Sequence, residues 1–162
     1  MRQLYRFLTL STAERRLLVR AVVVLAFVRL SLGLVPFPTL RRLVVGRLDR
    51  GRTAPSGDRG AVDQVVWAVT AASQHAPGWT TTCLSRALTV QAMLAHRGYQ
   101  SRLHVGVMRD ARGKLEGHAW VEGEGRILIG GTAADIVRFS PLAAFDSEPG
   151  KPLATESVRA RR

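Results

Sequence analysis

The spacing of hydrophobic residues changes near Gly98, and this change constrains the fold more than any other feature of the sequence. Before it, residues 83–97 place apolar side chains at the spacing of a helix. After it, residues 101–108, 115–122 and 126–131 form three short apolar runs, separated by the turn sequences RDARGK and EGEG. Helices followed by an antiparallel meander predict an α+β fold in which helices cover one face of a sheet.

Helical spacing also covers two stretches upstream. Residues 4–30 predict one or two helices with Ser11 or Thr12 as the N-cap. The apolar stripe expected there consists of Leu17, Leu18, Ala21, Val24, Leu25 and Val28. Residues 61–75 predict a further helix, one face of which carries Val62, Val65, Val66 and Val69.

Breaks in this pattern suggest how the chain is divided. Pro36 and Pro38 interrupt the first stretch, and a short basic helix, LRRLVVGRL, is expected after them. DRGRTAPSGDRG lacks apolar periodicity and is predicted to be a linker. We therefore expect four parts: an N-terminal helical segment (1–48), a linker (49–60), a core (61–146) and a flexible tail (147–162). The sequence leaves three roles possible for the N-terminal segment: packing on the core, binding to a membrane surface, or docking to another protein.

The chain is strongly basic, with 24 Lys and Arg against 12 Asp and Glu and a net charge of +12. Such an excess favours an acidic partner, although compositional bias explains it equally well. The longest apolar run, residues 21–28, is far shorter than the roughly 20 residues that span a bilayer, so no transmembrane helix is expected. A signal peptide is not expected either, because Glu14, Arg15 and Arg16 precede the run and no small-residue cleavage site follows it. A single cysteine forms no internal disulfide. We therefore expect a cytoplasmic protein, with peripheral attachment at the inner membrane surface as the alternative.

The single cysteine, Cys83, is predicted to lie where a helix begins, because Thr81 or Thr82 before it is a suitable N-cap. Unpaired N–H groups and the positive end of the helix dipole favour the thiolate there. The same N–H groups could hold an oxyanion during acyl transfer. A free cysteine is also commonly a small buried hydrophobic residue, so the local sequence allows both interpretations.

The histidine of GHAWVE, His118, is predicted to lie on a strand. Alternation places it on one face with Trp120 and Glu122, while Ala119 and Val121 occupy the other face. A thiol at a helix start, followed by a histidine on a strand, is typical of a cysteine nucleophile and its base.

A cysteine–histidine pair normally needs a third group to orient the imidazole. A hairpin turn centred on Glu124 would place Gly130 opposite His118, and glycine has no side chain for this role. Glu122 would lie about 13 Å along the same strand, at about 3.3 Å per residue, which is too far. Asp135, a main-chain carbonyl and a water molecule are the candidates.

Other chemistries lack a motif. The sequence contains no paired CxxC, no HExxH and no GxxxxGK[ST], so no metal and no cofactor is expected, and any ATP-driven step would belong to a partner. A non-enzymatic alternative is a basic adaptor that binds nucleic acid or a membrane. It lacks a basic patch interleaved with aromatic residues, so nucleic acid is not an expected partner.

Several motifs together resemble a known family. CLSRAL, RGY, LHVGV, GHAWVEGEGRILIGG and SPLAAF, with ERRLLVRAVVVLAFVRLSLGLVPF upstream, are similar to the lasso peptide biosynthesis B proteins of the transglutaminase-like cysteine protease superfamily. The resemblance covers most of residues 4–146. It implies a papain-like core in which the helix bearing the cysteine packs on an antiparallel sheet, with SPLAAF closing that core.

The resemblance also assigns roles to residues. It implies that Cys83 is the nucleophile and His118 the general base. Arg86, Trp120 and Glu122 match family positions without a defined role. Gly130 stands where the family has its third catalytic residue, an aspartate, so Asp135 is only a tentative third member.

By the same resemblance, the chain would be the separate peptidase half of the family. Its expected activity is removal of the leader from a ribosomally made precursor peptide, after which a partner lasso cyclase closes the freed N-terminus onto an Asp or Glu side chain. The expected partners are the precursor, the cyclase and a separate leader-binding protein, the RiPP recognition element. Transglutaminase-like acyl transfer is the alternative reaction for the same fold.

Overall fold

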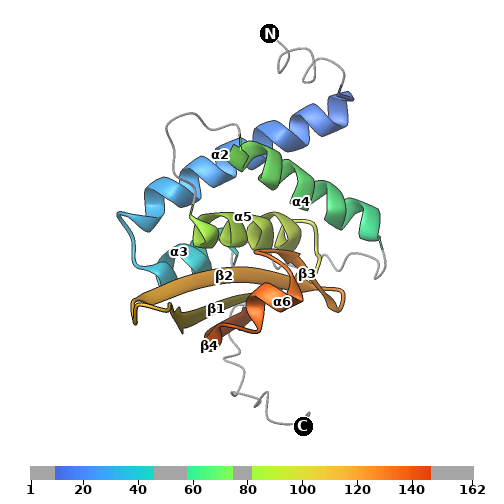
Figure 1. Cartoon of the computed structure of the whole chain (residues 1–162). Coiled ribbons are helices and arrows are strands. Elements are labelled where there is room, and N and C mark those ends of the chain that lie inside the picture. Colours follow the sequence, from blue (N-terminus) through green and yellow to red (C-terminus); the bar gives the residue numbers. More distant parts are fainter. Residues whose placement is uncertain (1–9, 46–57, 75–81, 147–162) are drawn as a thin grey trace.

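The computed structural model describes residues 10–45, 58–74 and 82–146 (Figure 1). In chain order, its elements are α2 (Thr12–Leu32), α3 (Phe37–Val44), α4 (Arg59–Gln74), α5 (Cys83–Ala95), β1 (Arg102–Arg109), β2 (Leu115–Gly123), β3 (Arg126–Ile129), α6 (Ala133–Ile136) and β4 (Ser140–Asp146). The strands form one antiparallel sheet in the order β3-β2-β1-β4, which confirms the α+β class. Most of the predicted linker and the whole of the predicted tail lie outside the described residues.

Helix α5 lies at the centre of the molecule. It packs on α2 and α4 on one side and on the sheet on the other (Figure 1). Its buried side chains therefore point in all directions: Ser85, Ala87, Leu88, Thr89, Val90, Gln91, Ala92, Met93 and Leu94. The hydroxyl of Thr89 donates to the carbonyl of Ser85 at 2.7 Å, which satisfies a polar group inside the core. The apolar spacing predicted a helix in residues 83–97, and the structure shows that this helix lies in the interior.

Helix α2 begins as predicted. Ser11 is the N-cap, and its hydroxyl accepts a hydrogen bond from the N–H of Glu14, whose carboxylate in turn accepts from the N–H of Ser11. Of the predicted stripe, the fully buried members are Leu17, Ala21, Leu25 and Val28. They pack on α4 and α5, so the N-terminal helices join the core. Within the described ranges, no helix has the length and apolar character needed to cross a bilayer.

Helix α3 begins earlier than predicted. Pro36 is its N-cap and Pro38 lies in the first turn, so the helix includes the proline that was expected to precede it. A proline in the first turn costs no intrahelical hydrogen bond, because N–H groups there have no carbonyl partner.

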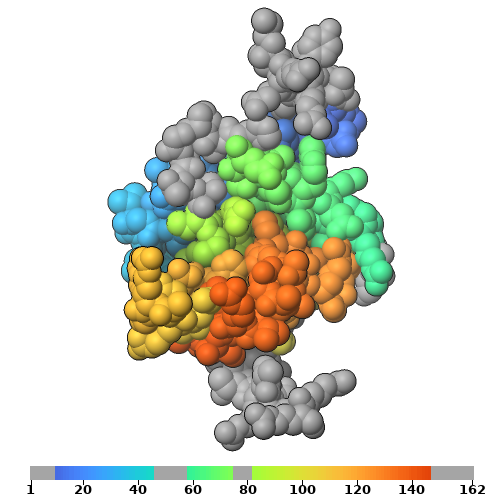
Figure 2. All heavy atoms as spheres, in the orientation of Figure 1, coloured from blue at the N-terminus to red at the C-terminus, as the bar shows by residue number. Residues whose placement is uncertain are grey.

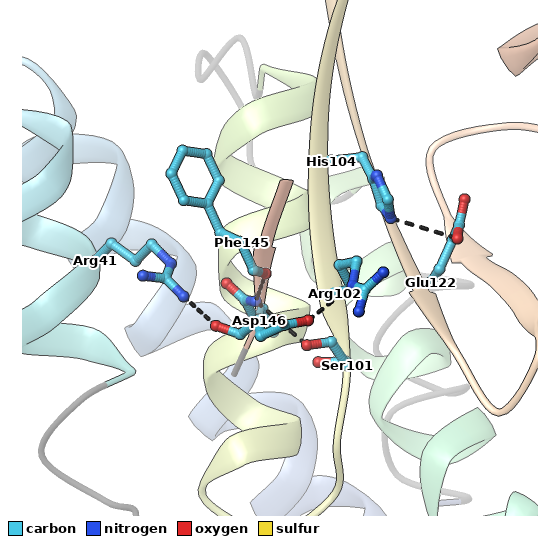
Figure 3. Close-up of polar contacts among 8 residues, drawn as sticks. Arg41, Ser101, Arg102, His104, Glu122, Phe145 and Asp146 are labelled. Atoms are coloured by element: carbon cyan, nitrogen blue, oxygen red, sulfur yellow. Dashed lines mark hydrogen bonds and ion pairs between the residues drawn. The ribbon is translucent and has the colours of Figure 1, made fainter. Parts of the chain in front are cut away.

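The SPLAAF segment was expected only to close the core. It forms an edge strand, β4, which pairs with β1. Gln91 of α5 donates to the carbonyl of Phe145 at 2.8 Å, and Arg41 of α3 donates to the carbonyl of Asp146 (Figure 3). The Asp146 carboxylate pairs with Arg102 of β1 at 2.7 Å. Phe145 also packs edge-on against Phe37, with ring centres 5.3 Å apart. These contacts hold β4 to two helices and to its neighbouring strand.

The register between β2 and β3 corrects the prediction. The turn consists of Glu124 and Gly125, both with positive φ, and Gly123 pairs with Arg126. An irregularity follows, so that Val121 pairs with Ile129. Gly130 therefore lies against Trp120, not directly opposite His118 as a turn centred on Glu124 implied.

Because α5 lies at the centre of the molecule, we expect a cavity in this helix to lower the free energy of unfolding substantially. Leu88→Ala, at a completely buried site, should lower the free energy of unfolding by about 2–5 kcal/mol. The matched change Leu30→Ala, on the exposed side of α2, should alter it by less than about 0.5 kcal/mol. Urea unfolding of both variants measures the difference, and equal values would contradict the layered arrangement.

Candidate active site

Cys83 is the first residue of α5, as predicted. Of the two candidate threonines, Thr82 is the N-cap, and its hydroxyl accepts from the N–H of Ser85 at 3.2 Å. The cysteine side chain is partly buried and packs against the hydrophobic core. The thiol thus lies in the first turn of the helix, where N–H groups lack carbonyl partners.

His118 lies half-buried on β2, and its ring is held from several sides. Its Nε2 donates to the main-chain carbonyl of Gly130 at 2.5 Å. The ring stacks on Phe139, with centres 4.9 Å apart, and lies 6.2 Å from the ring of Trp120. Because a carbonyl can only accept, this bond places a proton on Nε2 and leaves Nδ1 of the neutral ring as an acceptor.

A hollow of about 380 Å³ surrounds this histidine. Its lining residues are Arg86, Met108, Glu116, His118, Gly130, Gly131, Asp135, Arg138 and Phe139. The structure therefore brings His118, Gly130 and Asp135 together with Arg86, which lies three residues after Cys83 on α5. Cys83 itself is not part of this lining, and its thiol forms no hydrogen bond with His118.

Asp135 lies in the hollow, but its carboxylate is bonded elsewhere. It accepts from the N–H of Thr132 at 2.9 Å and from the Thr132 hydroxyl at 2.7 Å, which caps the short helix α6. These bonds, with smaller contributions from Arg138 and His118, hold the pKa of Asp135 below its ordinary value. Asp135 is therefore a carboxylate near His118. The hydrogen-bond partner of the imidazole is instead the carbonyl of Gly130, which accepts from Nε2.

Gly130 serves this site through its backbone. Its φ of +109° is one that side-chain-bearing residues rarely adopt, and an added Cβ would lie 2.5 Å from the Cβ of Trp120. The close approach to β2 is what brings the Gly130 carbonyl to the imidazole. Sequence analysis had left a main-chain carbonyl as one of three candidates, without identifying it.

Trp120 and Glu122 lie on the same face of the sheet as His118. The indole N–H of Trp120 donates to Glu122 at 2.9 Å, and His104, directly opposite in the register, stacks on the indole with centres 5.2 Å apart. The predicted alternation is confirmed, because Ala119 and Val121 face the core.

His104 is a member of this group that the sequence did not single out. Its Nε2 lies 3.3 Å from a Glu122 oxygen (Figure 3), but the two groups are not aligned as a hydrogen bond. Burial is the main cause that lowers the pKa of His104, assisted by Arg102 and opposed by Glu122. The only sequence signal for His104 was its place on the polar side of an alternating strand.

A larger groove of about 940 Å³ lies beside the β2–β3 turn and includes Gln100, Arg102, Glu122 and Arg126. It is open, and no cysteine or histidine is among the described residues that line it. The smaller hollow, which contains the imidazole of His118, is therefore the candidate site. No group of three His, Cys, Asp or Glu side chains suited to a metal ion occurs among the described residues.

Comparison with known families identifies the superfamily of the chain. The profile of the transglutaminase-like superfamily matches residues 18–144, from α2 to β4. The chain therefore belongs to the transglutaminase-like superfamily, which includes cysteine proteases. Membership indicates chemistry of the cysteine protease or acyltransferase type. No curated protein and no solved structure matches the chain.

The tight backbone contact at Gly130 predicts a specific sensitivity. Gly130→Ala should lower the free energy of unfolding by at least about 2 kcal/mol more than Gly125→Ala, because Gly125 also has positive φ but has open space around its Cα. Urea unfolding tests this. Similar losses for the two variants would mean that the approach of Gly130 to Trp120 is not required.

The buried His104 predicts that stability depends on pH. The unfolded chain binds a proton more readily than the folded one, so stability should fall as pH decreases through about 6.5. His104→Phe, which keeps a ring over Trp120, should flatten the decline between about pH 7 and about pH 5. Urea unfolding at several pH values measures the slope of stability against pH. The variant His96→Gln is measured in the same way, because burial and Arg20 also lower the pKa of His96 and so contribute to the slope. An unchanged slope in His104→Phe would refute the assignment.

Proposed function

We propose that this chain is the leader peptidase of a lasso peptide pathway and that it cleaves a precursor at the leader–core junction. The resemblance of its motifs to lasso peptide B proteins suggests the substrate, and membership of the superfamily supports the class of chemistry. The observation that carries the proposal is the bond from His118 Nε2 to the Gly130 carbonyl, because it prepares Nδ1 to act as a base.

In the proposed reaction, His118 Nδ1 takes the proton of the Cys83 thiol. The thiolate then attacks the carbonyl carbon at the junction, and the C–N bond breaks as His118 returns the proton to the leaving amine. Water next attacks the thioester, which releases the leader as a carboxylic acid and restores the thiol. The thiol and imidazole would close to hydrogen-bonding distance in the substrate complex, as catalytic contacts commonly do.

Arg86 is proposed to position the substrate. Its Nε is buried and has no hydrogen-bond partner among the described residues, although its side chain lines the hollow beside His118. The guanidinium carries a fixed positive charge and further N–H donors, which suit a substrate carbonyl bound in the hollow. The N–H groups in the first turn of α5 would hold the oxyanion of the tetrahedral intermediate.

The proposal predicts that both members of the pair are needed for cleavage. Cys83→Ala and His118→Ala should each reduce the cleavage rate by at least about 10³-fold, because the loss of either one removes the activated nucleophile. The assay combines the precursor with the leader-binding protein and follows the products by mass spectrometry. His96→Gln, at the other end of α5, should cleave at the parent rate.

The same assay separates the alternatives. Cleavage by Cys83→Ala at the parent rate would overturn the proposal. A product that lacks the added mass of water and instead carries an amine would indicate acyl transfer. Asp135→Asn should cost less than about 10-fold if the Gly130 carbonyl orients His118, whereas a loss near 10⁴-fold would assign that role to Asp135.

A further inference from the structure

Helix α2 is apolar on two opposite faces, and only one of them is used by the fold. The inner face packs on α4 and α5, as described above. The outer face carries a stripe of exposed apolar side chains, namely Val19 (52%), Val22 (49%), Val23 (60%), Phe27 (46%), Leu30 (60%) and, just after the helix, Leu34 (84%). We call these six residues the outer stripe.

The outer stripe is continuous along the helix. At about 100° per residue, its members fall on the side opposite Leu17, Ala21 and Val28. Within α2 the stripe runs from Val19 to Leu30, which is about 17 Å along the helix axis at 1.5 Å per residue. In Figure 1, α2 and α4 lie on the side of α5 away from the sheet, and Figure 2 shows part of α2 (blue) at the surface of the molecule. Apolar surface of this extent is typical of an interaction site.

Positive charges border the outer stripe. The helical spacing places Arg20 along one side and Arg29 along the other, while Arg16 precedes the stripe at its N-terminal end. Glu14 is the only acidic residue of α2, and its carboxylate caps the helix through Ser11. The next helix, α3, adds the exposed Arg42 and Leu43 and contains no acidic residue. This charge pattern complements a negatively charged surface.

We propose that the outer stripe docks on an anionic membrane surface. Its side chains are aliphatic with a single phenylalanine, whereas the centre of a protein interface is enriched in Tyr and Trp. A straight stripe on a convex helix with bordering arginines suits a fluid bilayer, in which apolar side chains enter the acyl boundary and guanidinium groups reach the headgroups. The net charge of +12 would attract the chain to such a surface over longer distances.

The test uses the full chain with lipid vesicles. The parent should co-sediment with vesicles of phosphatidylcholine and phosphatidylglycerol, bind weakly to phosphatidylcholine alone, and dissociate as salt is raised. The double variant Val23→Glu/Leu30→Glu should bind the anionic vesicles at least about tenfold more weakly. Leu142→Glu is the matched control, because Leu142 is 68% exposed on β4 and lies outside the outer stripe.

Three results would overturn the proposal. These are equal binding by the parent and the double variant, equal loss in Leu142→Glu, or a dimer in vesicle-free solution that the double variant converts to a monomer. The last result would show that a second copy covers the stripe. Circular dichroism and urea unfolding verify that the variants fold. Precursor cleavage in vesicle-free solution is a separate readout that should match the parent, so failure here is distinct from failure of the peptidase proposal.

Discussion

The burial of α5 on all sides is the constraint on which the rest of the structure depends. The helix fills the space between the α2–α4 layer and the sheet, so its axial rotation is fixed by neighbours in every direction. Gln91 strengthens this constraint, because its amide donates to Phe145 of the edge strand from inside the core. A rigid element therefore carries the first turn of α5, in which Cys83 packs against the core and Arg86 lines the hollow beside His118. Sites built on such elements hold their geometry better than sites built on loops.

The contact between His118 and Gly130 replaces a carboxylate with a neutral carbonyl. Either group fixes the tautomer and the plane of the ring, but a carbonyl stabilises an imidazolium less than a carboxylate does, because charge-assisted hydrogen bonds are roughly twice as strong. Asp135 contributes negative charge near the ring without taking over this hydrogen bond. The backbone of Gly130, and not a carboxylate, therefore fixes the tautomer and the plane of the ring.

The sequence predicted elements better than it predicted their pairing. Hydrophobic period and capping residues placed α2, α4 and α5, and alternation placed β1 and β2, since these signals are local. The register of β3 was missed because it depends on a two-residue turn and an irregularity that no single residue reveals. Strand β4 was missed as a strand because its position comes from distant partners, Gln91 and Arg41. The motifs placed Cys83 at a helix start and His118 on a strand, and the catalytic roles of both stay predictions. The carbonyl of Gly130 is a backbone group, and its contact with His118 becomes visible only in three dimensions.

The two faces of α2 limit how this helix could meet a bilayer. Its inner residues Ala21 and Val28 are fully buried against α4 and α5, so removing α2 from the body would expose the central helix as well. The free energy of folding lost in this way would far exceed the free energy that one half-exposed apolar stripe gains from contact with lipid, because fully buried apolar side chains contribute about 1.5–3 kcal/mol each. The helix must then dock as a fixed part of the domain, parallel to the surface, with its inner face still supporting α5. Such docking would leave the sheet and its hollow on the far side of the domain, where a peptide substrate can approach from solution.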